Sequence, residues 1–286
     1  MTAPRRTSAN RATPAGRAYL DLRSEARKAG RATAEYLRLY ALEGFLARLA
    51  ASSHVHALVL KGGVLLAAYD LRRPTADIDF AALAQSREIE HVRQLVIDVA
   101  QTVLPAGQDD GLQFDTSNAH AESIRDEDEY SGVRVTLRAQ LATANETFHV
   151  DVNVGDPIWP QPETVHVPRL LGGHIDLLGY PIPMVLAEKV VTAAQRGTAN
   201  TRWRDFGDIW ALARTHPSPR PTCAPLSPAS PNTATSPCNH SPPPCPATPT
   251  SPKPDGLLGD AAATPTTYPS SSTPSWTPSS SSPTPS

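Results

Sequence analysis

Residues 60–80 read LKGGVLLAAYDLRRPTADIDF, and this stretch decides the fold. Gly62 and Gly63 stand at the start of an apolar run that is typical of a helix. After a basic turn, Asp77 and Asp79 occupy alternate positions of a predicted strand, so their side chains share one face. Two carboxylates so close repel each other unless a cation offsets their charge. The stretch therefore predicts a helix, a turn and a strand that presents two acidic groups.

A glycine pair beside paired carboxylates is suited to binding a nucleotide together with a hard metal ion. Mg²⁺ prefers carboxylate oxygens and shares the phosphates of a nucleotide. Because glycine lacks a Cβ, backbone N–H groups at a helix start can approach an anion closely, and the helix dipole favours phosphate there. We expect Asp77 and Asp79 to bind Mg²⁺, and Lys61, Gly62 and Gly63 to line a phosphate site. The plain alternative is a solvated strand end.

A third carboxylate follows in residues 148–154, FHVDVNV. The valines alternate with polar residues, as they do in a strand with one buried face, and Asp151 lies on the polar face. Residues 133–139 alternate in the same way and predict another strand. Asp151 is thus a candidate third metal ligand, although a carboxylate that merely solvates a strand would show the same pattern.

A second group of candidates lies between residues 181 and 212. Residues 183–196 have helical periodicity and carry Lys189, whose ammonium could bind a β- or γ-phosphate. Asp205 and Asp208 stand three apart in a second predicted helix and so share a face. One of them could orient Lys189 or act as a base on an acceptor hydroxyl. The alternative is an Arg/Asp network that ties this helix to the sheet.

The turn before the acidic strand contains Arg72, Arg73 and Thr75. Each guanidinium could pair with Asp77 or bind a phosphate in a bidentate manner. Thr75 could cap the turn or position a phosphate. We assign Arg73 and Thr75 to the nucleotide site.

Composition divides the chain into three parts. Residues 1–18 are expected to be a basic disordered arm, residues 19–216 a folded domain, and residues 217–286 a disordered tail that holds twenty of the thirty prolines. The first thirty-one residues carry eight basic side chains against two acidic ones, and this basic stretch either contacts phosphates or only aids solubility. A long helical pattern from residue 19 to 51 is interrupted at Gly30.

Histidines and cysteines give no standard metal motif. The three cysteines, Cys223, Cys238 and Cys245, all lie in the tail near His240, in a spacing that matches no zinc pattern. His54 and His56 are expected to be ordinary turn residues. The whole chain has a net charge of −2. A cysteine-free domain, no apolar stretch long enough for a membrane span and no signal-peptide core predict a soluble, cytoplasmic protein.

Two motifs resemble those of the AbiEii/AbiGii-type nucleotidyltransferase toxins, which belong to the DNA polymerase β-like nucleotidyltransferases. The first is GG followed by R-x-T-x-D-x-D, at residues 62–79. The second is A-E-K at residues 187–189, followed by N-x-R-x-R-D-x-x-D at residues 200–208. The resemblance implies an α+β fold, a mixed sheet flanked by helices, with Asp151 completing a two-metal site. It implies transfer of a nucleoside monophosphate from an NTP to a hydroxyl with Mg²⁺.

The same resemblance implies a toxin of a toxin–antitoxin or phage-defence system, with a cognate antitoxin protein and, in some relatives, the 3′ end of tRNA as acceptor. It covers residues 34–215, whereas family members usually continue with further helices, so the helical C-terminal part is expected to be truncated. One alternative is therefore a non-catalytic remnant that binds nucleotide or a partner protein. An antibiotic-modifying nucleotidyltransferase would share D-x-D but not the second motif.

Overall fold

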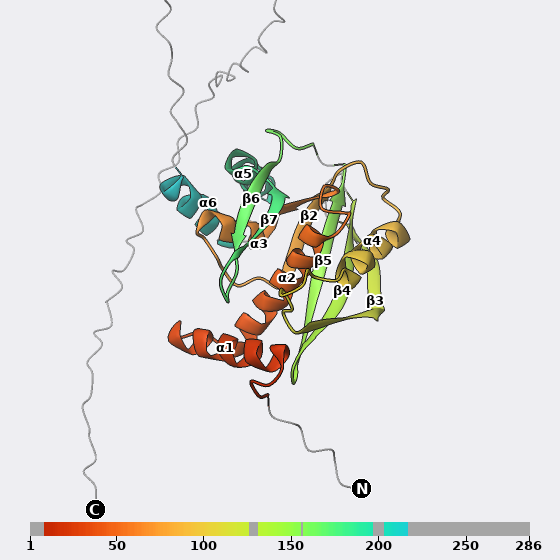
Figure 1. Cartoon of the computed structure of the whole chain (residues 1–286). Coiled ribbons are helices and arrows are strands. Elements are labelled where there is room, and N and C mark those ends of the chain that lie inside the picture. The colour runs from red at the N-terminus through yellow and green to blue at the C-terminus, as the bar shows by residue number, and fades with distance from the viewer. Residues whose placement is uncertain (1–8, 126–130, 156, 197–202, 217–286) are drawn as a thin grey trace, which may run out of the picture. The chain divides into compact units, whose positions relative to one another are not determined.

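A seven-stranded mixed sheet is the centre of the fold (Figure 1). The computed structural model describes residues 9–125, 131–155, 157–196 and 203–216. The strands lie in the order β3-β4-β5-β2-β1-β7-β6. Their bounds are β1 Leu58–Lys61, β2 Asp77–Ala82, β3 Leu112–Arg125, β4 Ser131–Leu141, β5 Ala144–Val154, β6 Glu163–Pro168 and β7 His174–Gly179. The α+β class with a mixed sheet flanked by helices, predicted from the sequence, is confirmed. The β3–β4–β5 meander and the β6–β7 pair extend the sheet on both sides of β2 and β1.

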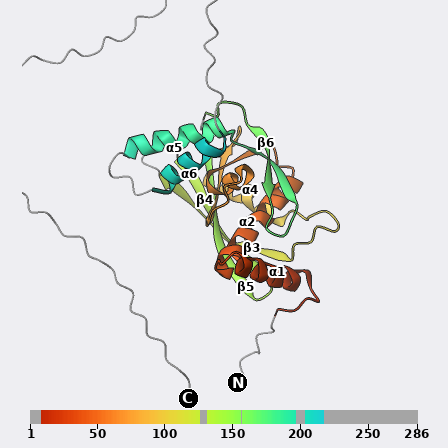
Figure 2. The same ribbon diagram turned by 90° about the vertical axis from the view of Figure 1, so that its left-hand side faces the viewer.

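Helices pack around this sheet (Figures 1 and 2). They are α1 Pro14–Lys28, α2 Thr33–Ala51, α3 Gly62–Leu65, α4 Ile89–Gln101, α5 Ile182–Arg196 and α6 Trp203–Thr215, and a 3-10 helix, Leu66–Tyr69, continues α3. The helices α5 and α6 lie side by side, as Figure 2 shows. None of the helices in the described part of the chain has the length and apolar character that a membrane crossing needs.

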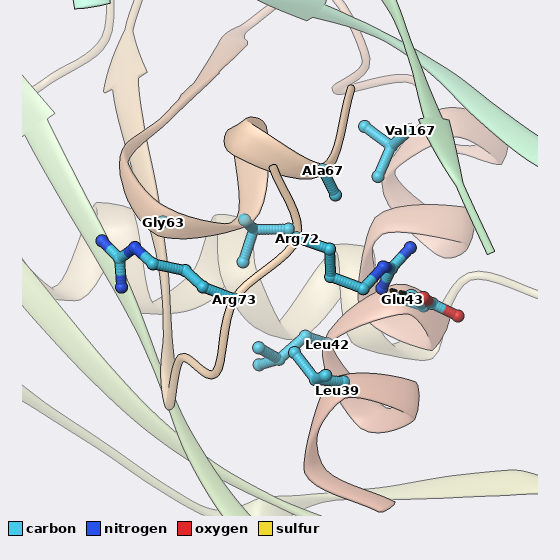
Figure 3. Close-up of a pocket in the computed structure, with 9 residues that line it drawn as sticks. Leu39, Leu42, Glu43, Gly63, Ala67, Arg72, Arg73 and Val167 are labelled. Atoms are coloured by element: carbon cyan, nitrogen blue, oxygen red, sulfur yellow. Dashed lines mark hydrogen bonds and ion pairs between the residues drawn. The ribbon is translucent and has the colours of Figure 1, made fainter. Parts of the chain in front are cut away.

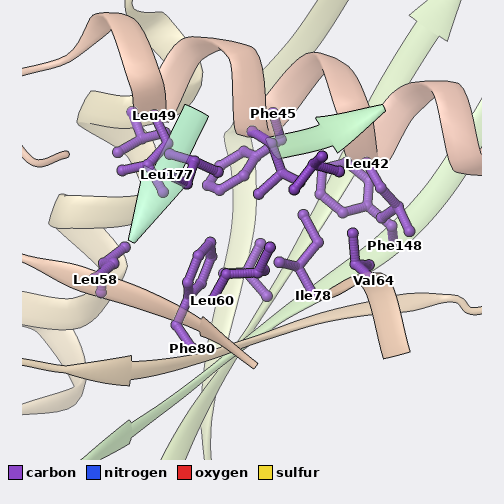
Figure 4. Packing of buried hydrophobic residues seen from close by; sticks show 14 of the residues in the cluster. Leu42, Phe45, Leu49, Leu58, Leu60, Val64, Ile78, Phe80, Phe148 and Leu177 are labelled. Atoms are coloured by element: carbon purple, nitrogen blue, oxygen red, sulfur yellow. The ribbon is translucent and has the colours of Figure 1, made fainter. Parts of the chain in front are cut away.

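Helix α2 supplies much of the apolar core (Figure 4). Its Phe45 side chain is fully buried and meets the Phe148 ring edge-on, with 6.1 Å between the ring centroids. Ile78 and Phe80 of β2 are also fully buried. Burying a side chain of this size stabilises a fold by about 1.5–3 kcal/mol. The apolar residues that alternate with Asp77 and Asp79 therefore hold β2 in place while the carboxylates lie on the other face.

The first two helices follow the predicted pattern with one difference. The break at Gly30 is present, with a φ of +66° that suits glycine. Helix α1, however, begins at Pro14, inside the stretch expected to be a disordered arm, because Thr13 Oγ1 accepts a hydrogen bond from the Gly16 N–H at 3.1 Å and proline suits the first helical turn. The expectations for residues 1–8 and 217–286 lie outside the described residues and stay predictions.

Candidate active site

Three carboxylates meet on the polar face of the sheet. Strands β2 and β5 run parallel with Asp79 directly beside Asp151, while Asp77 is two residues earlier on the same face. One oxygen from each of Asp77, Asp79 and Asp151 lies within 4.8 Å of the other two. The opposite faces of both strands carry buried apolar side chains, which fix this register. The residues predicted to share a metal are therefore brought together by strand pairing.

The negative charge of this group is incompletely compensated. Burial, followed by the charges of Asp77 and Asp151, raises the pKa of Asp79 to about 7, and the Lys61 ammonium only partly opposes this. A carboxylate whose pKa rises so far is electrostatically disfavoured in its ionised form. A divalent cation would offset that penalty, because the three oxygens lie within 4.8 Å of one another and are the ligand type that hard cations prefer.

Gly62 gives the chain room to pass beside Asp79. Its φ is +65°, and a Cβ at this position would lie 1.9 Å from Asp79 Oδ2. Only glycine fits such an approach. A Cβ on Gly63 would lie 3.0 Å from Thr75 Oγ1 and 3.3 Å from two Arg73 nitrogens. The glycine pair thus lies between the carboxylates and the following turn.

The helix that starts at Gly62 is shorter than the sequence suggested. Helix α3 ends at Leu65 and continues as one turn of 3-10 helix. A segment of this length adds little macrodipole, so any phosphate binding here depends on the individual backbone N–H groups.

The two arginines of the turn point in opposite directions (Figure 3). Arg72 donates a 2.6 Å hydrogen bond to Glu43 Oε1 of α2, and a second one to the Pro168 carbonyl oxygen. Arg72 therefore ties the turn to the scaffold and does not pair with Asp77. Arg73 points the other way, with Nη2 at 3.2 Å from Asp208 Oδ2. Thr75 Oγ1 donates a 2.5 Å hydrogen bond to Asp77 Oδ1.

Lys189 lies in a second charged cluster with its predicted neighbours. Its Nζ donates hydrogen bonds of 2.8 Å to Asp205 Oδ1 and of 2.8 Å to Asp208 Oδ2. Both Lys189 and Asp208 are buried. Arg73, which contacts Asp208 and also lies beside Gly63, connects this cluster with the acidic group. The contacts fit either an oriented phosphate-binding lysine or an Arg/Asp network that fixes α6.

Two further charged residues belong to the site although sequence reasoning did not identify them. Arg134 of β4 lies opposite Asp151 and donates hydrogen bonds of 2.8 and 2.6 Å to its two oxygens. The bond to Asp151 raises the pKa of Arg134. Glu188 accepts a hydrogen bond of 3.1 Å from Lys61 Nζ and, through its charge, raises the pKa of Asp79. Glu188 stands in the A-E-K motif, whereas Arg134 showed only as a polar residue in an alternating strand.

Both predicted motifs fall within the match to one protein family. The family model of the nucleotidyl transferase AbiEii toxin of type IV toxin–antitoxin systems matches residues 44–253. The chain belongs to the AbiEii nucleotidyltransferase toxin family. The match begins before the GG turn and ends beyond His216, so it also includes part of the proline-rich segment. The resemblance inferred from the two motifs is confirmed.

The chain is only distantly similar to solved structures. JHP933 from Helicobacter pylori matches with a TM-score of 0.41 and 16% identity, over 61% of this chain and 64% of that one. An antigenic nucleotidyltransferase-like protein from Paracoccidioides brasiliensis matches with a TM-score of 0.37 and 16% identity, over 62% of this chain and 76% of that one. The AbiEii-family chain thus spans somewhat less than two thirds of the length of the H. pylori protein. No curated protein matched it.

Proposed function

We propose that the chain is a metal-dependent nucleotidyltransferase that moves a nucleoside monophosphate from an NTP to an acceptor hydroxyl. The observation that carries this proposal is the meeting of Asp77, Asp79 and Asp151 within 4.8 Å beside a glycine turn. Membership in the AbiEii family supports the same reaction class.

The donor set fits a divalent cation such as Mg²⁺. Three carboxylates on two strands supply oxygen ligands, and the raised pKa of Asp79 reflects its burial first and then the charges of Asp77 and Asp151, which Lys61 offsets only in part. Arg134 occupies one lone pair on each Asp151 oxygen, which leaves further lone pairs for a metal. When bound, such a cation would stabilise charge on the reacting phosphate and the departing pyrophosphate.

The remaining site residues bind and orient the substrates in this proposal. Gly62 and Gly63 let the backbone approach the phosphates, and Lys61 and Arg73 add positive charge at the two sides of the glycine turn. Thr75 orients Asp77 through its hydrogen bond. Lys189 is our candidate for a phosphate contact, in which it would exchange one of its aspartate partners for the nucleotide.

Asp205 and Asp208 are our candidates for accepting the proton of the acceptor hydroxyl. Both lie 2.8 Å from Lys189 Nζ, and Asp205 keeps slightly more exposed side-chain surface, 15% against 10%. As acceptor we propose the 3′ hydroxyl of tRNA, which the family resemblance implies. The biological role that we propose is that of a toxin, paired with an antitoxin protein, in phage defence.

A labelling assay tests the reaction directly. The full chain is incubated with Mg²⁺, a tRNA pool and each NTP labelled at either the α- or the γ-phosphate. Only α-label should enter RNA, because nucleotidyl transfer releases the β- and γ-phosphates together. Asp79→Asn should abolish labelling, whereas Asp70→Asn, a change at an exposed left-handed turn position, should not. Transfer of γ-label, or equal labelling by Asp79→Asn, would contradict the proposal.

Two readouts separate the remaining alternatives. NTP binding without transfer to RNA would favour a non-catalytic remnant. Growth arrest on induced expression, absent with Asp79→Asn, would support the toxin role, and arrest by both forms would show that toxicity does not come from transfer.

A further inference from the structure

A second group of metal-ligating side chains lies on the β6–β7 edge of the sheet, outside the site described above. His166 of β6 stands directly opposite Asp176 of β7, and His174 lies two residues before Asp176 on the same face. Their ligand atoms all lie within 4.8 Å of one another. The three side chains are 54–69% exposed, so a metal ion in solution can reach them freely.

The positions of these residues are fixed by the opposite face of the two strands. Val165, Val167, Ile175 and Leu177 alternate with them and are at most 5% exposed. Strand pairing therefore sets which side chains face one another, and the buried face prevents a shift in register. Ligands on paired strands are held more accurately than ligands on loops.

The distances between the ligand atoms of His166, His174 and Asp176 are close to those between ligands of one metal ion. Around a four-coordinate zinc ion with bonds of about 2.0–2.1 Å, two ligand atoms lie roughly 3.3 Å apart. His174 Nε2 and Asp176 Oδ1 are 3.5 Å apart, and His166 Nδ1 and Asp176 Oδ1 are 2.6 Å apart in a hydrogen bond. Replacing the shared proton by a metal would require this pair to open by only about 0.7 Å.

The two imidazole rings support the same geometry. Two imidazoles on one tetrahedral ion have ring centroids about 5 Å apart. The centroids of His166 and His174 are 5.5 Å apart, and the ring planes are nearly perpendicular. The rings therefore need only a small adjustment to direct one nitrogen each at a common point beside Asp176.

We propose that His166, His174 and Asp176 form a binding site for a divalent transition-metal ion of the zinc class. Two imidazoles and one carboxylate are the ligand set that such ions prefer, whereas Mg²⁺ prefers an all-oxygen environment. Because all three ligands are exposed, water would complete the coordination of such an ion. This site is chemically distinct from the group around Asp79, and it does not rest on the proposed transferase activity.

Binding of Zn²⁺ and Co²⁺ to the full, tag-free chain tests the proposal. Calorimetry should show one Zn²⁺ bound per chain at this site, unaffected by a large excess of Mg²⁺. Co²⁺ bound there should give visible absorption bands whose intensity reports four- or five-coordination. His166→Ala, His174→Ala and Asp176→Asn should each weaken Zn²⁺ binding by roughly tenfold or more, and the double histidine variant should abolish it.

Three controls make the result specific to this edge. His91→Ala removes another exposed histidine and should leave binding unchanged. Replacing Cys223, Cys238 and Cys245 by serine removes the tail thiols, and Asp79→Asn alters the acidic group; neither should affect the site. Because all three ligands are exposed, the metal-free melting temperature should stay constant in their variants. Equal Zn²⁺ binding by the wild type and the double histidine variant would overturn the proposal.

Discussion

Gly62 lies so close to Asp79 that a Cβ on residue 62 would come within 1.9 Å of the Asp79 Oδ2 atom. The backbone of the glycine turn and the carboxylate of β2 are therefore fitted to each other. This relationship explains why a glycine pair precedes D-x-D by this spacing, since any larger residue would displace the carboxylate.

The first prediction concerns that fit. Gly62→Ala should displace Asp79 and lower both the melting temperature and the transfer rate. Gly30→Ala is a matched control, because Gly30 has nearly the same φ, +66°, but a Cβ there would have no atom within 4 Å. Left-handed strain alone costs about 1–2 kcal/mol and should appear in both variants. If Gly62→Ala lost no more stability or activity than Gly30→Ala, the close approach of residue 62 to Asp79 would not matter for folding or for transfer.

The second prediction is a pH dependence that arises from Asp79. Because its pKa is raised from 3.8 to about 7, the native state binds a proton that the unfolded state has already released between those values. Stability of the metal-free chain should therefore fall as pH rises from about 4 to 7. Asp79→Asn should remove this slope and raise the melting temperature at pH 8, by about 2–4 °C for each kcal/mol gained when no charge is buried beside Asp77 and Asp151. Thermal unfolding in EDTA at pH values from 4 to 8 measures this change of stability. If stability changed equally with pH in the wild type and in Asp79→Asn, the pH dependence would not come from Asp79.

The third prediction concerns Arg134. Arg134→Gln removes the bidentate partner of Asp151 and should destabilise the metal-free chain by about 1–3 kcal/mol, because a buried carboxylate loses its charged donor. The variant should gain more stability from added Mg²⁺ than the wild type gains. Arg138→Gln, an exposed change on the same strand face, is the control and should alter neither quantity. Equal melting curves for the two variants would show that Arg134 is not a structural partner of the site.

The fourth prediction separates the two roles of Lys189. Lys189→Met leaves Asp205 and Asp208 facing each other, and should cost up to roughly 3–5 kcal/mol. The combined variant with Asp205→Asn and Asp208→Asn should recover part of that stability, because the two carboxylates no longer repel each other, although Arg73 loses its Asp208 partner. If Lys189 binds phosphate, this combined variant should bind NTP with a higher dissociation constant than Asp205→Asn/Asp208→Asn alone; binding is the readout because both variants lack the carboxylates proposed to accept the proton. Equal constants would leave Lys189 as a purely structural residue.

Local patterns in the sequence were sufficient for the centre of the fold. Strict alternation around Asp79 and Asp151 predicted two strands with polar faces, and burial of the intervening residues confirmed it. The direct pairing of Asp79 with Asp151 was not contained in either pattern alone. It depends on long-range strand pairing, and only the family resemblance suggested it.

Other features depended on contacts that local patterns do not encode. The β6–β7 pair was missed although Val165 and Val167 alternate with polar residues, since short strands at a sheet edge carry a weak signal. Arg134 was missed because its partner is on another strand. In α6, Trp203, Phe206 and Trp210 are 52–72% exposed, so apolar periodicity did not identify the buried face, which instead carries Asp208 and Leu212.

Mn²⁺ binding measured by electron paramagnetic resonance tests most directly whether Asp77, Asp79 and Asp151 hold a divalent cation. Mn²⁺ favours oxygen ligands as Mg²⁺ does. The measurement uses the full chain with His166 and His174 changed to alanine, so that the β6–β7 edge does not contribute, and a non-hydrolysable NTP analogue. We predict bound Mn²⁺ that Mg²⁺ displaces and that is lost on changing Asp79 or Asp151 to asparagine, but kept in Asp70→Asn. Mn²⁺ binding that is equally strong in the Asp79→Asn and Asp151→Asn variants would contradict the metal site.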